Sequence, residues 1–401
     1  MKKKILFVIN TLGGAGAEAA LVALLHLLDP MKYDISVFVL TNQGELIHRL
    51  PDYVRVRNVF YDDSSVLTDE GKKRLKKHVL RIGLGHGSVF KNVPYLVKNF
   101  KCMLKKGKVQ PDKLLWRVLS DGAERMDEKF DLAVAYLEGG SAYYVADHIK
   151  ADKKAVFVHI DYNMAGYTRS LDKDCYLCYD KIFSVSEEVR QQFLKVYPEC
   201  ERKTAVFHNI IDQEELRRKA KLPGGFSDDF QGIRILTVGR LSTQKAYEVS
   251  IDAMRLLKDK GENIRWYVLG EGSERKKLEE QIERLGLQED FILMGAVENP
   301  YPYYDQTDLY VHASRFEGKS IAIQEAQTLG CPVLVSDCSG NREQVTEGVD
   351  GLMCDLTPES ICGGILEYIN DPEKRKLYGE NAAKKRIDAR TDLDQLLSML
   401  E

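Results

Sequence analysis

Two glutamates, Glu317 and Glu325, lie eight positions apart on either side of a short polar turn. The apolar segment 308–312 leads into the turn and predicts a strand, and the residues from Ser320 to Gly330 predict a helix. Glu325 then lies about a turn and a half into that helix. The free amides of the first helical turn suit a phosphate group. Such a site can bind a nucleotide sugar, with Glu317 at the sugar hydroxyls, the amides at the diphosphate and Glu325 at the ribose diol.

Two cations five positions apart, Arg240 and Lys245, form a second candidate site after Gly239. Their segment follows a predicted strand and precedes a predicted helix, which places it at the carboxyl edge of a sheet. Arg240 can hold a diphosphate in a planar fork and Lys245 as a point charge. Both can stabilise negative charge on a departing UDP or GDP. A solvated basic loop is the alternative, and the presence of Glu317 and Glu325 disfavours it.

A glycine-rich loop, residues 13–18, follows the first predicted strand and precedes a helix. Gly14 lets the backbone approach a phosphate closely. A tight turn between a strand and a helix is the alternative. The loop lacks the GxGxxG pattern, and the second strand does not end in an acid, so a dinucleotide-binding dehydrogenase is a poor interpretation.

Histidines at two segment ends leave two interpretations open. His159 ends an apolar strand and can bond a sugar or an acceptor, or its ring can be satisfied by backbone. His208 opens the segment through Asp212 that joins the two halves of the chain. There Asn209 and Asp212 can belong to a site, or can cap the next helix at a hinge.

Composition describes a soluble globular protein of two domains. The chain has 401 residues, 44% of them hydrophobic and 30% charged, with a net charge of -3. This charge gives no case for nucleic acid. Cys175 and Cys178 form one CxxC without a second pair at zinc spacing, so reduced thiols of a cytosolic protein are expected. The apolar run at residues 5–9 is short for a signal peptide, and no segment approaches the roughly 18 apolar residues of a membrane helix.

Strands and helices alternate through both halves of the chain, which predicts an α/β fold of two Rossmann-like domains. Strands are expected at residues 4–10, 33–40, 132–136, 154–158, 181–185, 233–238, 265–269, 291–294, 308–311, 332–336 and 351–353. We expect an N-terminal domain over residues 1–207 and a C-terminal domain over 208–372. Residues 373–401 are expected to form a helix that packs back on the first domain.

The N-terminal domain contains a basic insertion at about residues 69–120. Residues 72–117 hold fourteen Lys or Arg and one acid, Asp112, with apolar residues interleaved. A basic amphipathic surface suits anionic lipid headgroups. The alternative is a solvated, mostly helical insertion, and RNA binding lacks any known module. Asp172-Lys173-Asp174 has the DxD form of a metal site but does not follow a convincing strand.

Taken together, these residues resemble the retaining glycosyltransferases of family 4 (group 1), which have the GT-B fold. The resemblance spans most of the chain, and the order and spacing of its motifs carry it. The matching residues are Gly13-Gly14 with Ala17-Glu18, His159, Asn209 with Asp212, Gly239-Arg240 with Lys245, Glu317-Gly318 through Glu325-Ala326, and residues 330–337 followed by Gly340-Asn341-Arg342-Glu343.

The resemblance implies two Rossmann-like domains facing across a cleft, with acceptor in the first domain and donor in the second. Front-face attack would retain the α configuration without a protein nucleophile, a cofactor or an essential metal. Catalytic roles would fall on Glu317, His159, Arg240 and Lys245. The implied donor-binding residues are Gly14, Gly239, Arg240, Lys245, Glu317, Gly318, Lys319, Ser320, Ile321 and Glu325.

Two positions depart from the family pattern. Ala246 follows Lys245 where glycine is usual, which alters the loop and leaves both cations in place. Lys319-Ser320 stands where many members have Phe-Gly or Phe-Pro. The second departure bears on which donor sugar is used.

The sequence therefore predicts a metal-independent, retaining hexosyltransferase. It would move a sugar from a nucleotide sugar, with a UDP-sugar favoured, to a glycan or lipid-linked acceptor in cell-surface polysaccharide synthesis. The expected location is the cytoplasm, peripherally at the inner face of the cell membrane. One alternative is a non-catalytic GT-B subunit that binds glycan or stabilises a partner. Another is a sugar-nucleotide epimerase, which needs a second catalytic carboxylate or histidine set in the N-terminal domain.

Overall fold

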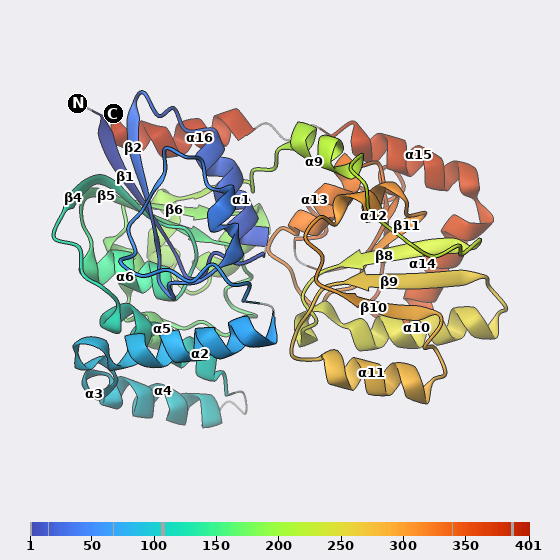
Figure 1. Cartoon of the computed structure of the whole chain (residues 1–401), viewed down its shortest axis with the longest axis horizontal. Coiled ribbons are helices and arrows are strands. Elements are labelled where there is room, and N and C mark those ends of the chain that lie inside the picture. The colour runs from blue at the N-terminus through green and yellow to red at the C-terminus, as the bar shows by residue number, and fades with distance from the viewer. Residues whose placement is uncertain (1, 15, 67, 106–108, 339, 386–388) are drawn as a thin grey trace. The chain divides into compact units, whose positions relative to one another are not determined.

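The computed structural model describes residues 2–14, 16–66, 68–105, 109–338, 340–385 and 389–401. The chain divides into two compact units (Figure 1). The first unit comprises residues 1–210 together with 388–401, and the second comprises residues 211–387. The observed boundary after Ile210 lies close to the one expected after residue 207.

A seven-stranded parallel sheet organises the first unit, in the order β3-β2-β1-β4-β5-β6-β7. Its strands are β1 (Lys3–Ile9), β2 (Tyr33–Val39), β3 (Arg55–Val56), β4 (Lys129–Ala135), β5 (Lys150–Val158), β6 (Lys181–Ser184) and β7 (Thr204–Val206). The order in which the chain adds strands reverses between β1 and β4. The carboxyl ends of β1 and β4 therefore form the switch point, where open α/β sheets bind ligands.

Helices cover both faces of this sheet, and the strands are accordingly continuous apolar runs. Residues 5–9 of β1 expose at most 1% of their surface. The helices outside the basic segment are α1 (Gly16–His26), α6 (Gly140–His148), α7 (Arg169–Asp172) and α8 (Glu187–Leu194), with short turns η1 (Glu45–Arg49), η3 (Cys175–Cys178) and η4 (Pro198–Lys203). One core joins α6 and α8 to the sheet through buried tyrosines and aliphatic residues.

The basic segment of the first unit is helical. Its elements are α2 (Asp69–Leu84), η2 (Gly85–Gly87), α3 (Ser88–Lys91), α4 (Val93–Lys105) and α5 (Pro111–Gly122). The helix α5 packs on α6, and α2 packs on α5. Tyr95, Met103, Leu114 and Leu171 form a small core that holds α4 against α5 and α7. In Figure 1 the helices α2, α3 and α4 lie beyond α5, away from the sheet.

A six-stranded parallel sheet organises the second unit, in the order β10-β9-β8-β11-β12-β13. Its strands are β8 (Ile233–Val238), β9 (Ile264–Leu269), β10 (Phe291–Gly295), β11 (Leu309–His312), β12 (Val333–Ser336) and β13 (Leu352–Cys354). The switch point here lies between β8 and β11. The α/β prediction of two Rossmann-like domains is therefore confirmed.

Two cores hold the helices of the second unit on opposite faces of its sheet. One core contains residues of α10 (Tyr247–Asp259), α11 (Arg275–Arg284) and α14 (Pro358–Asn370). The other contains residues of α12 (Tyr301–Asp305) and α13 (Ile321–Thr328). The helix α9 (Gln213–Ala220) packs on α12 and α13. Asp212 caps α9 by accepting the backbone N–H of Glu215 at 2.9 Å. Of the two interpretations of the segment from His208 to Asp212, this hydrogen bond supports the one in which Asp212 caps the next helix.

The C-terminal region differs from the single returning helix expected over residues 373–401. The helix α15 (Pro372–Ala383) stays in the second unit, because it packs on α13 and α14. The helix α16 (Ala389–Leu397) and the turn η6 (Ser398–Leu400) belong to the first unit. There Asp392 Oδ2 accepts the backbone N–H of His208 and lies 3.0 Å from its ring Nδ1.

All eight cysteines are free thiols, including those of the CxxC pair. Within the described part of the chain, the helices are too short or too polar to cross a bilayer.

Candidate active site

The switch point of the second sheet brings Lys245 and Glu317 together. Lys245 follows β8, Glu317 follows β11, and the two strands are hydrogen-bonded neighbours. Lys245 Nζ lies 2.6 Å from Glu317 Oε1 and 3.0 Å from Nε2 of His312, the last residue of β11. His312 Nε2 lies 3.1 Å from the same Glu317 oxygen, and the Tyr310 hydroxyl lies 3.0 Å from His312 Nδ1. A cation and a carboxylate predicted from separate segments thus form one cluster.

Burial strengthens the interactions within this cluster. The side chains of Lys245, Glu317 and His312 expose 15%, 7% and 1% of their surface. Burial alone would raise the pKa of Glu317, but the Lys245 ammonium and the His312 ring hold it below its usual value. Burial and the Lys245 charge lower the pKa of His312, so its ring is neutral at pH 7. Lys245 is paired with a carboxylate rather than free, and a diphosphate would share its ammonium with Glu317.

Glu325 lies on α13 and contacts two tyrosines of α12. Its carboxylate accepts the hydroxyl of Tyr301 at 3.1 Å and that of Tyr304 at 3.2 Å. Burial raises the pKa of Glu325 to about 7, although both tyrosine hydrogen bonds lower it. Glu325 is therefore close to half-ionised at neutral pH, and a ligand that donates hydrogen bonds favours its ionised form.

The loop after β8 presents Arg240 to solvent. Arg240 is exposed and forms no ion pair with any residue that the structure describes. A Cβ on Gly239 would lie 3.2 Å from the Tyr247 hydroxyl and 3.4 Å from Lys245 Cε, so glycine allows close packing there. Ala246, where the resembled family has glycine, takes the left-handed conformation with φ 47° and ψ 36°. The departure from the family pattern thus falls where the backbone favours glycine.

The backbone between the two glutamates turns into the amino end of α13. Ser320 directly precedes the helix, and its carbonyl accepts Gln344 Nε2 at 3.3 Å. A Cβ on Gly340 would lie 2.1 Å from the carbonyl oxygen of Gly318, so only glycine permits this approach. The predicted phosphate contacts, the amides of Lys319, Ser320 and Ile321, accordingly lie at a helix amino terminus.

The first unit places Glu138 and His159 at the carboxyl edge of its sheet. Asn10, which follows β1, donates Nδ2 to the carbonyl of Glu138 at 3.2 Å and accepts the Ser141 N–H at 2.7 Å. Glu138 Oε2 accepts the backbone N–H of His159 at 2.9 Å. These hydrogen bonds tie together the loops that follow β1, β4 and β5.

The glycine-rich loop is engaged by a carboxylate of its own unit. Gly14 donates its N–H to Glu45 Oε1 at 2.9 Å, and Ser65 donates its hydroxyl to the same oxygen at 3.0 Å. The Val66 N–H donates to Glu45 Oε2 at 3.3 Å. The amide predicted to approach a phosphate therefore already serves an anion, the Glu45 side chain. Part of this loop, Ala15, lies outside the described residues.

Sequence reasoning did not select His312 or Glu138 as site residues. His312 ends an apolar strand as His159 does, so the same signal was available. Glu138 precedes the pair Gly139-Gly140 after a strand, much as Glu317 precedes Gly318. A strand end followed by a carboxylate and glycine is the pattern that could have identified it.

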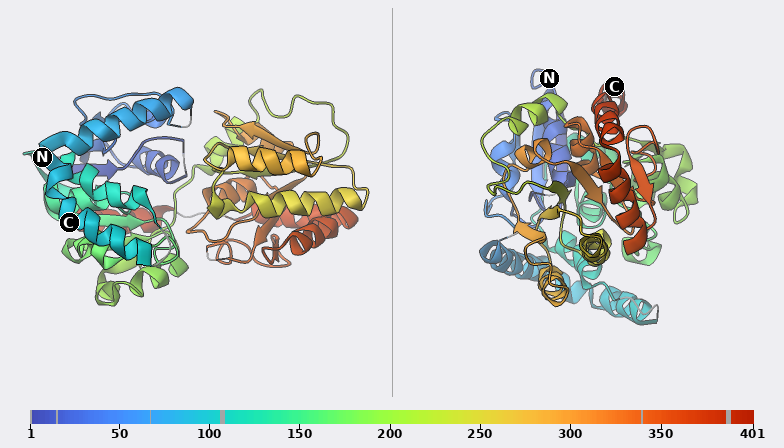
Figure 2. Two further views of the ribbon diagram at one scale, coloured as in Figure 1. Left: turned by 90° about the horizontal axis from the view of Figure 1, so that it is seen from below. Right: turned by 90° about the vertical axis from the view of Figure 1, so that its right-hand side faces the viewer.

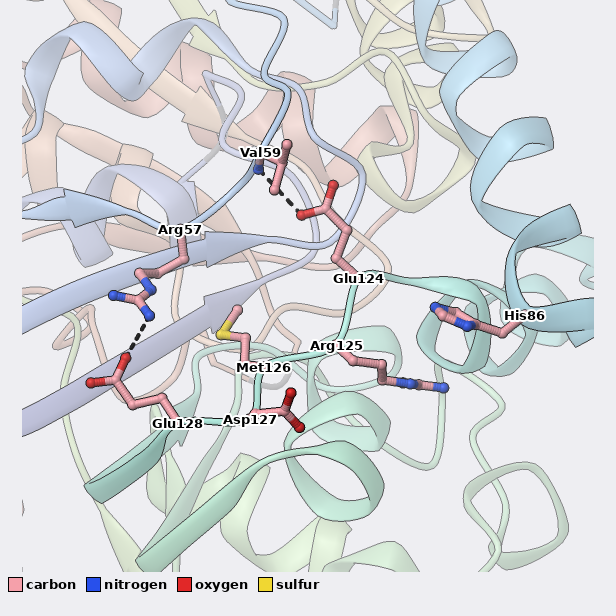
Figure 3. Close-up of a pocket in the computed structure, with 8 residues that line it drawn as sticks. All are labelled: Arg57, Val59, His86, Glu124, Arg125, Met126, Asp127 and Glu128. Carbon is pink, nitrogen blue, oxygen red and sulfur yellow. Dashed lines mark hydrogen bonds and ion pairs between the residues drawn. The ribbon is translucent and has the colours of Figure 1, made fainter.

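A cavity of about 520 Å³ lies elsewhere on the first unit (Figure 3). It is lined by Arg57, Val59, His86, Glu124, Arg125, Met126, Asp127 and Glu128. Arg57 and Val59 lie just after β3, and residues 124–128 lie just before β4. The cavity therefore lies near the amino end of β4. Arg57 is paired with Glu128 at 2.5 Å, and Glu124 accepts the Val59 N–H at 3.2 Å. None of the predicted site residues lines it.

Two acidic groups with metal-site patterns are satisfied by protein partners. Within the described residues, one group of three metal-ligating side chains occurs, Asp121, Asp147 and His148. Its members bond one another or Arg117: His148 lies 2.9 Å from Asp121, and Arg117 donates to Asp147. Asp172 of the DxD segment is buried and accepts three tyrosine hydroxyls. Neither group lies at a sheet switch point.

Comparison with known proteins identifies the second unit. Residues 226–385 match the family model for glycosyl transferases group 1. The chain is 33% identical over 205 residues to N-acetylgalactosamine-N,N'-diacetylbacillosaminyl-diphospho-undecaprenol 4-alpha-N-acetylgalactosaminyltransferase of Campylobacter jejuni. This match covers 51% of the chain and 53% of that relative. It is 28% identical to alpha-D-kanosaminyltransferase of Streptomyces kanamyceticus, over 43% of the chain and 45% of that relative.

The chain thus matches only about half the length of these curated relatives. Over the whole chain, its fold is similar to that of HepE from Anabaena, solved with UDP and glucose. The TM-score is 0.68 at 18% identity, with 99% of both chains covered. Each unit therefore has the parallel-sheet, Rossmann-like fold found in the GT-B glycosyltransferase structures. Over residues 226–385, this chain is therefore similar to the glycosyl transferases of group 1.

Proposed function

We propose that the protein transfers a hexose from a nucleotide sugar, with a UDP-sugar favoured, to a glycan or lipid-linked acceptor. The cluster of Lys245, Glu317 and His312 at the switch point of the second sheet carries this proposal. One similar enzyme is named for a diphospho-undecaprenol acceptor, and a similar structure was solved with UDP and glucose. The name of the first supports a lipid-linked acceptor, and the ligands of the second support a UDP-sugar donor. We propose a role in cell-surface polysaccharide synthesis on this basis.

In the proposed reaction the donor lies at the carboxyl edge of the second sheet. Glu317 accepts hydroxyls of the donor sugar, and Glu325 accepts those of the ribose. Arg240, Lys245 and the amides at the start of α13 neutralise the diphosphate as charge builds on its leaving oxygen. Retention would follow from attack on the face that the diphosphate leaves, with a phosphate oxygen taking the acceptor's proton. These groups supply the positive charge that a metal supplies elsewhere, so we propose a metal-independent reaction.

Nucleotide release from a panel of UDP- and GDP-sugars tests the function. We expect slow hydrolysis of one donor without an acceptor, faster turnover with lipid-linked or soluble glycosides, and retention of activity in EDTA. Nucleotide binding without turnover of any donor would favour the non-catalytic subunit.

One observation supports the alternative that the protein is a sugar-nucleotide epimerase. Glu138 and His159 supply a carboxylate and a histidine in the first unit, the set that this alternative needs. Proton NMR of UDP-N-acetylglucosamine incubated with the protein distinguishes the two reactions. Conversion to an epimer without release of UDP would replace the transferase by the epimerase.

The basic segment supports a peripheral membrane location. On α4, Val93, Val97, Phe100 and Leu104 expose 46%, 47%, 44% and 55% of their surface. Their spacing of four, three and four residues places them on one stripe of the helix. Exposed lysines at 98, 101 and 105 adjoin this stripe. In the right-hand view of Figure 2, α4 (cyan) lies at the outer edge of the first unit.

We infer that this stripe enters the headgroup region of an anionic membrane, while the lysines contact lipid phosphates. Flotation with vesicles containing anionic lipid should recover the protein, and recovery should fall as salt rises. The variant Val97→Ser/Phe100→Ser should float several-fold less. Leu377→Ser, which alters a 51% exposed leucine of α15, is the matched control. Equal flotation with neutral vesicles, or of both variants, would contradict membrane docking.

A further inference from the structure

The first sheet has its own switch point, and it holds side chains that the donor site does not use. The loops after β1 and β4 meet there through the Asn10 hydrogen bonds to Glu138 and Ser141. Glu138 follows β4 just as Glu317 follows β11, and β4 and β11 are the corresponding strands of the two sheets. Ligands of open α/β sheets bind at this position.

Glu138 and His159 both offer hydrogen-bond acceptors at this edge. The His159 ring donates to the carbonyl of Tyr136, and its Nε2 is buried without a partner among the described residues. A neutral imidazole has one N–H, and here the other ring nitrogen uses it to donate to Tyr136. Nε2 therefore has a lone pair that can accept a hydrogen bond. Glu138 is half-buried, and its carboxylate keeps acceptor capacity beyond the His159 N–H.

The pair therefore favours a ligand that donates hydrogen bonds. A bound metal ion would need further ligands, and no third His, Cys, Asp or Glu joins this pair among the described residues. Burial raises the pKa of Glu138 and lowers that of His159 to about 3, so both groups are poorly hydrated. Hydroxyl groups of a ligand can supply the hydrogen bonds that water does not.

An aromatic ring lies beside the same loop. A Cβ on Gly139 would lie 3.2 Å from Trp116 Cδ1, and a Cβ on Gly140 would lie 2.7 Å from Trp116 Cε3. Glycine at both positions thus allows the half-buried indole to pack against the loop that carries Glu138. Sugars present apolar C–H faces as well as hydroxyls, and an indole suits such a face.

We propose that Glu138, together with His159, binds two hydroxyl groups of the acceptor sugar at the switch point of the first sheet. The identification of this sugar as the acceptor rests on the proposed function; the hydroxyl-binding site itself does not. Glu138 would then help to select acceptors whose hydroxyls match the spacing of the two groups.

Saturation-transfer NMR on the full chain tests the site without turnover. The probes are the methyl glycosides of glucose, galactose, N-acetylglucosamine and N-acetylgalactosamine, each with and without UDP. We expect the wild-type protein to saturate the ring protons of at least one glycoside. Glu138→Gln should weaken that binding about tenfold, the order expected when a hydrogen bond loses its charged partner.

The variants separate binding from folding. Glu138→Gln keeps a side-chain oxygen for the His159 N–H, so a purely structural role of Glu138 would leave glycoside binding unchanged. Glu138→Asp keeps the charge and should bind with intermediate affinity. Glu124→Gln, before the amino end of β4, is the control and should behave as wild type. Thermal stabilisation by UDP should be the same in every variant, because UDP would bind the second unit.

Two results would overturn the proposal: equal saturation of the glycosides by wild type and Glu138→Gln, or no saturation by wild type with any of the four. Failure of the proposed function gives a different result. In that case the glycosides bind in a Glu138-dependent manner while no nucleotide sugar is turned over.

Discussion

At the scale of single residues, the proposed donor site contains charged side chains that already have partners within the protein. Lys245 is paired with Glu317, and Glu325 is held by two tyrosine hydroxyls. In the Lys245–Glu317 pair, each charge offsets much of the cost of burying the other. The pair therefore keeps both groups in place while a donor is absent.

Removal of one member of the pair should be more harmful than removal of both. Glu317→Gln leaves the Lys245 ammonium buried without its carboxylate, which should cost about 3 kcal/mol of unfolding free energy. The double variant Lys245→Met/Glu317→Gln removes both charges and should recover part of that loss. Urea denaturation of the two variants measures the difference. Additive losses in the double variant would show that the two charges do not stabilise each other.

Glu325 should make donor binding depend on pH. Its pKa of about 7 means that the carboxylate, the form that accepts two ribose hydroxyls, grows as pH rises from 6 to 8. At pH 6 roughly a tenth is ionised, so UDP-glucose should bind up to about tenfold more weakly than at pH 8. Calorimetric titration at both pH values measures this. Glu325→Gln should lose the pH dependence; its persistence there would assign the effect to another group.

At the scale of elements, the two switch points decide which side chains meet. The neighbouring strands β8 and β11 end at the same sheet edge, so their loops bring together residues 72 positions apart. The loop after β8 must also turn sharply into α10, and it does so through Ala246 in a left-handed conformation. The turn therefore requires a left-handed conformation that alanine disfavours.

Ala246→Gly should stabilise the second unit. Glycine removes the roughly 1–2 kcal/mol that an L-residue incurs in this conformation, and its greater freedom in the unfolded chain opposes part of that gain. The expected net gain is about 0.5–1 kcal/mol by urea denaturation. Ala253→Gly, inside the regular helix α10, is the control and should lose about 1 kcal/mol or more. Equal losses in both variants would mean that the backbone at 246 is not strained.

At the scale of the whole molecule, the chain forms two units with separate parallel sheets and separate cores. The proposed donor groups, apart from Gly14, belong to the second unit, and the proposed acceptor groups, Glu138 and His159, belong to the first. Each ligand should therefore act mainly on one unit.

Hydrogen exchange should show this division. Added UDP should slow amide exchange in the loops after β8 and β11 and at the start of α13. The effect should reach about 2.7 kcal/mol at one hundred times the dissociation constant, for amides that exchange only when the second unit unfolds. Amides of β4 and β5 serve as the internal control and should change less. Protection confined to the first unit would contradict the donor assignment.

The sequence by itself determined the fold class and most strands, because each sheet is covered on both faces and its strands are unbroken apolar runs. It also determined Glu317, Glu325, Arg240 and Lys245 as candidates, because their loops carry local strand–loop–helix patterns. It missed the two-residue strand β3 and the three-residue strand β7, which are too short to give a periodic signal. It also misplaced α15, which packs on α13 and α14 of the second unit instead of returning to the first.

Only the tertiary structure decided which candidates meet. Parallel strands that are far apart in the sequence end at the same edge of a sheet. In the second sheet this strand order brings Lys245 to Glu317 and His312. In the first sheet it places Glu138 beside His159. It also showed that Asp172 of the DxD segment is buried among tyrosines. A local sequence pattern specifies which types of side chain are present. The burial of each side chain and the residues it interacts with depend on contacts that form only when the sheet is assembled.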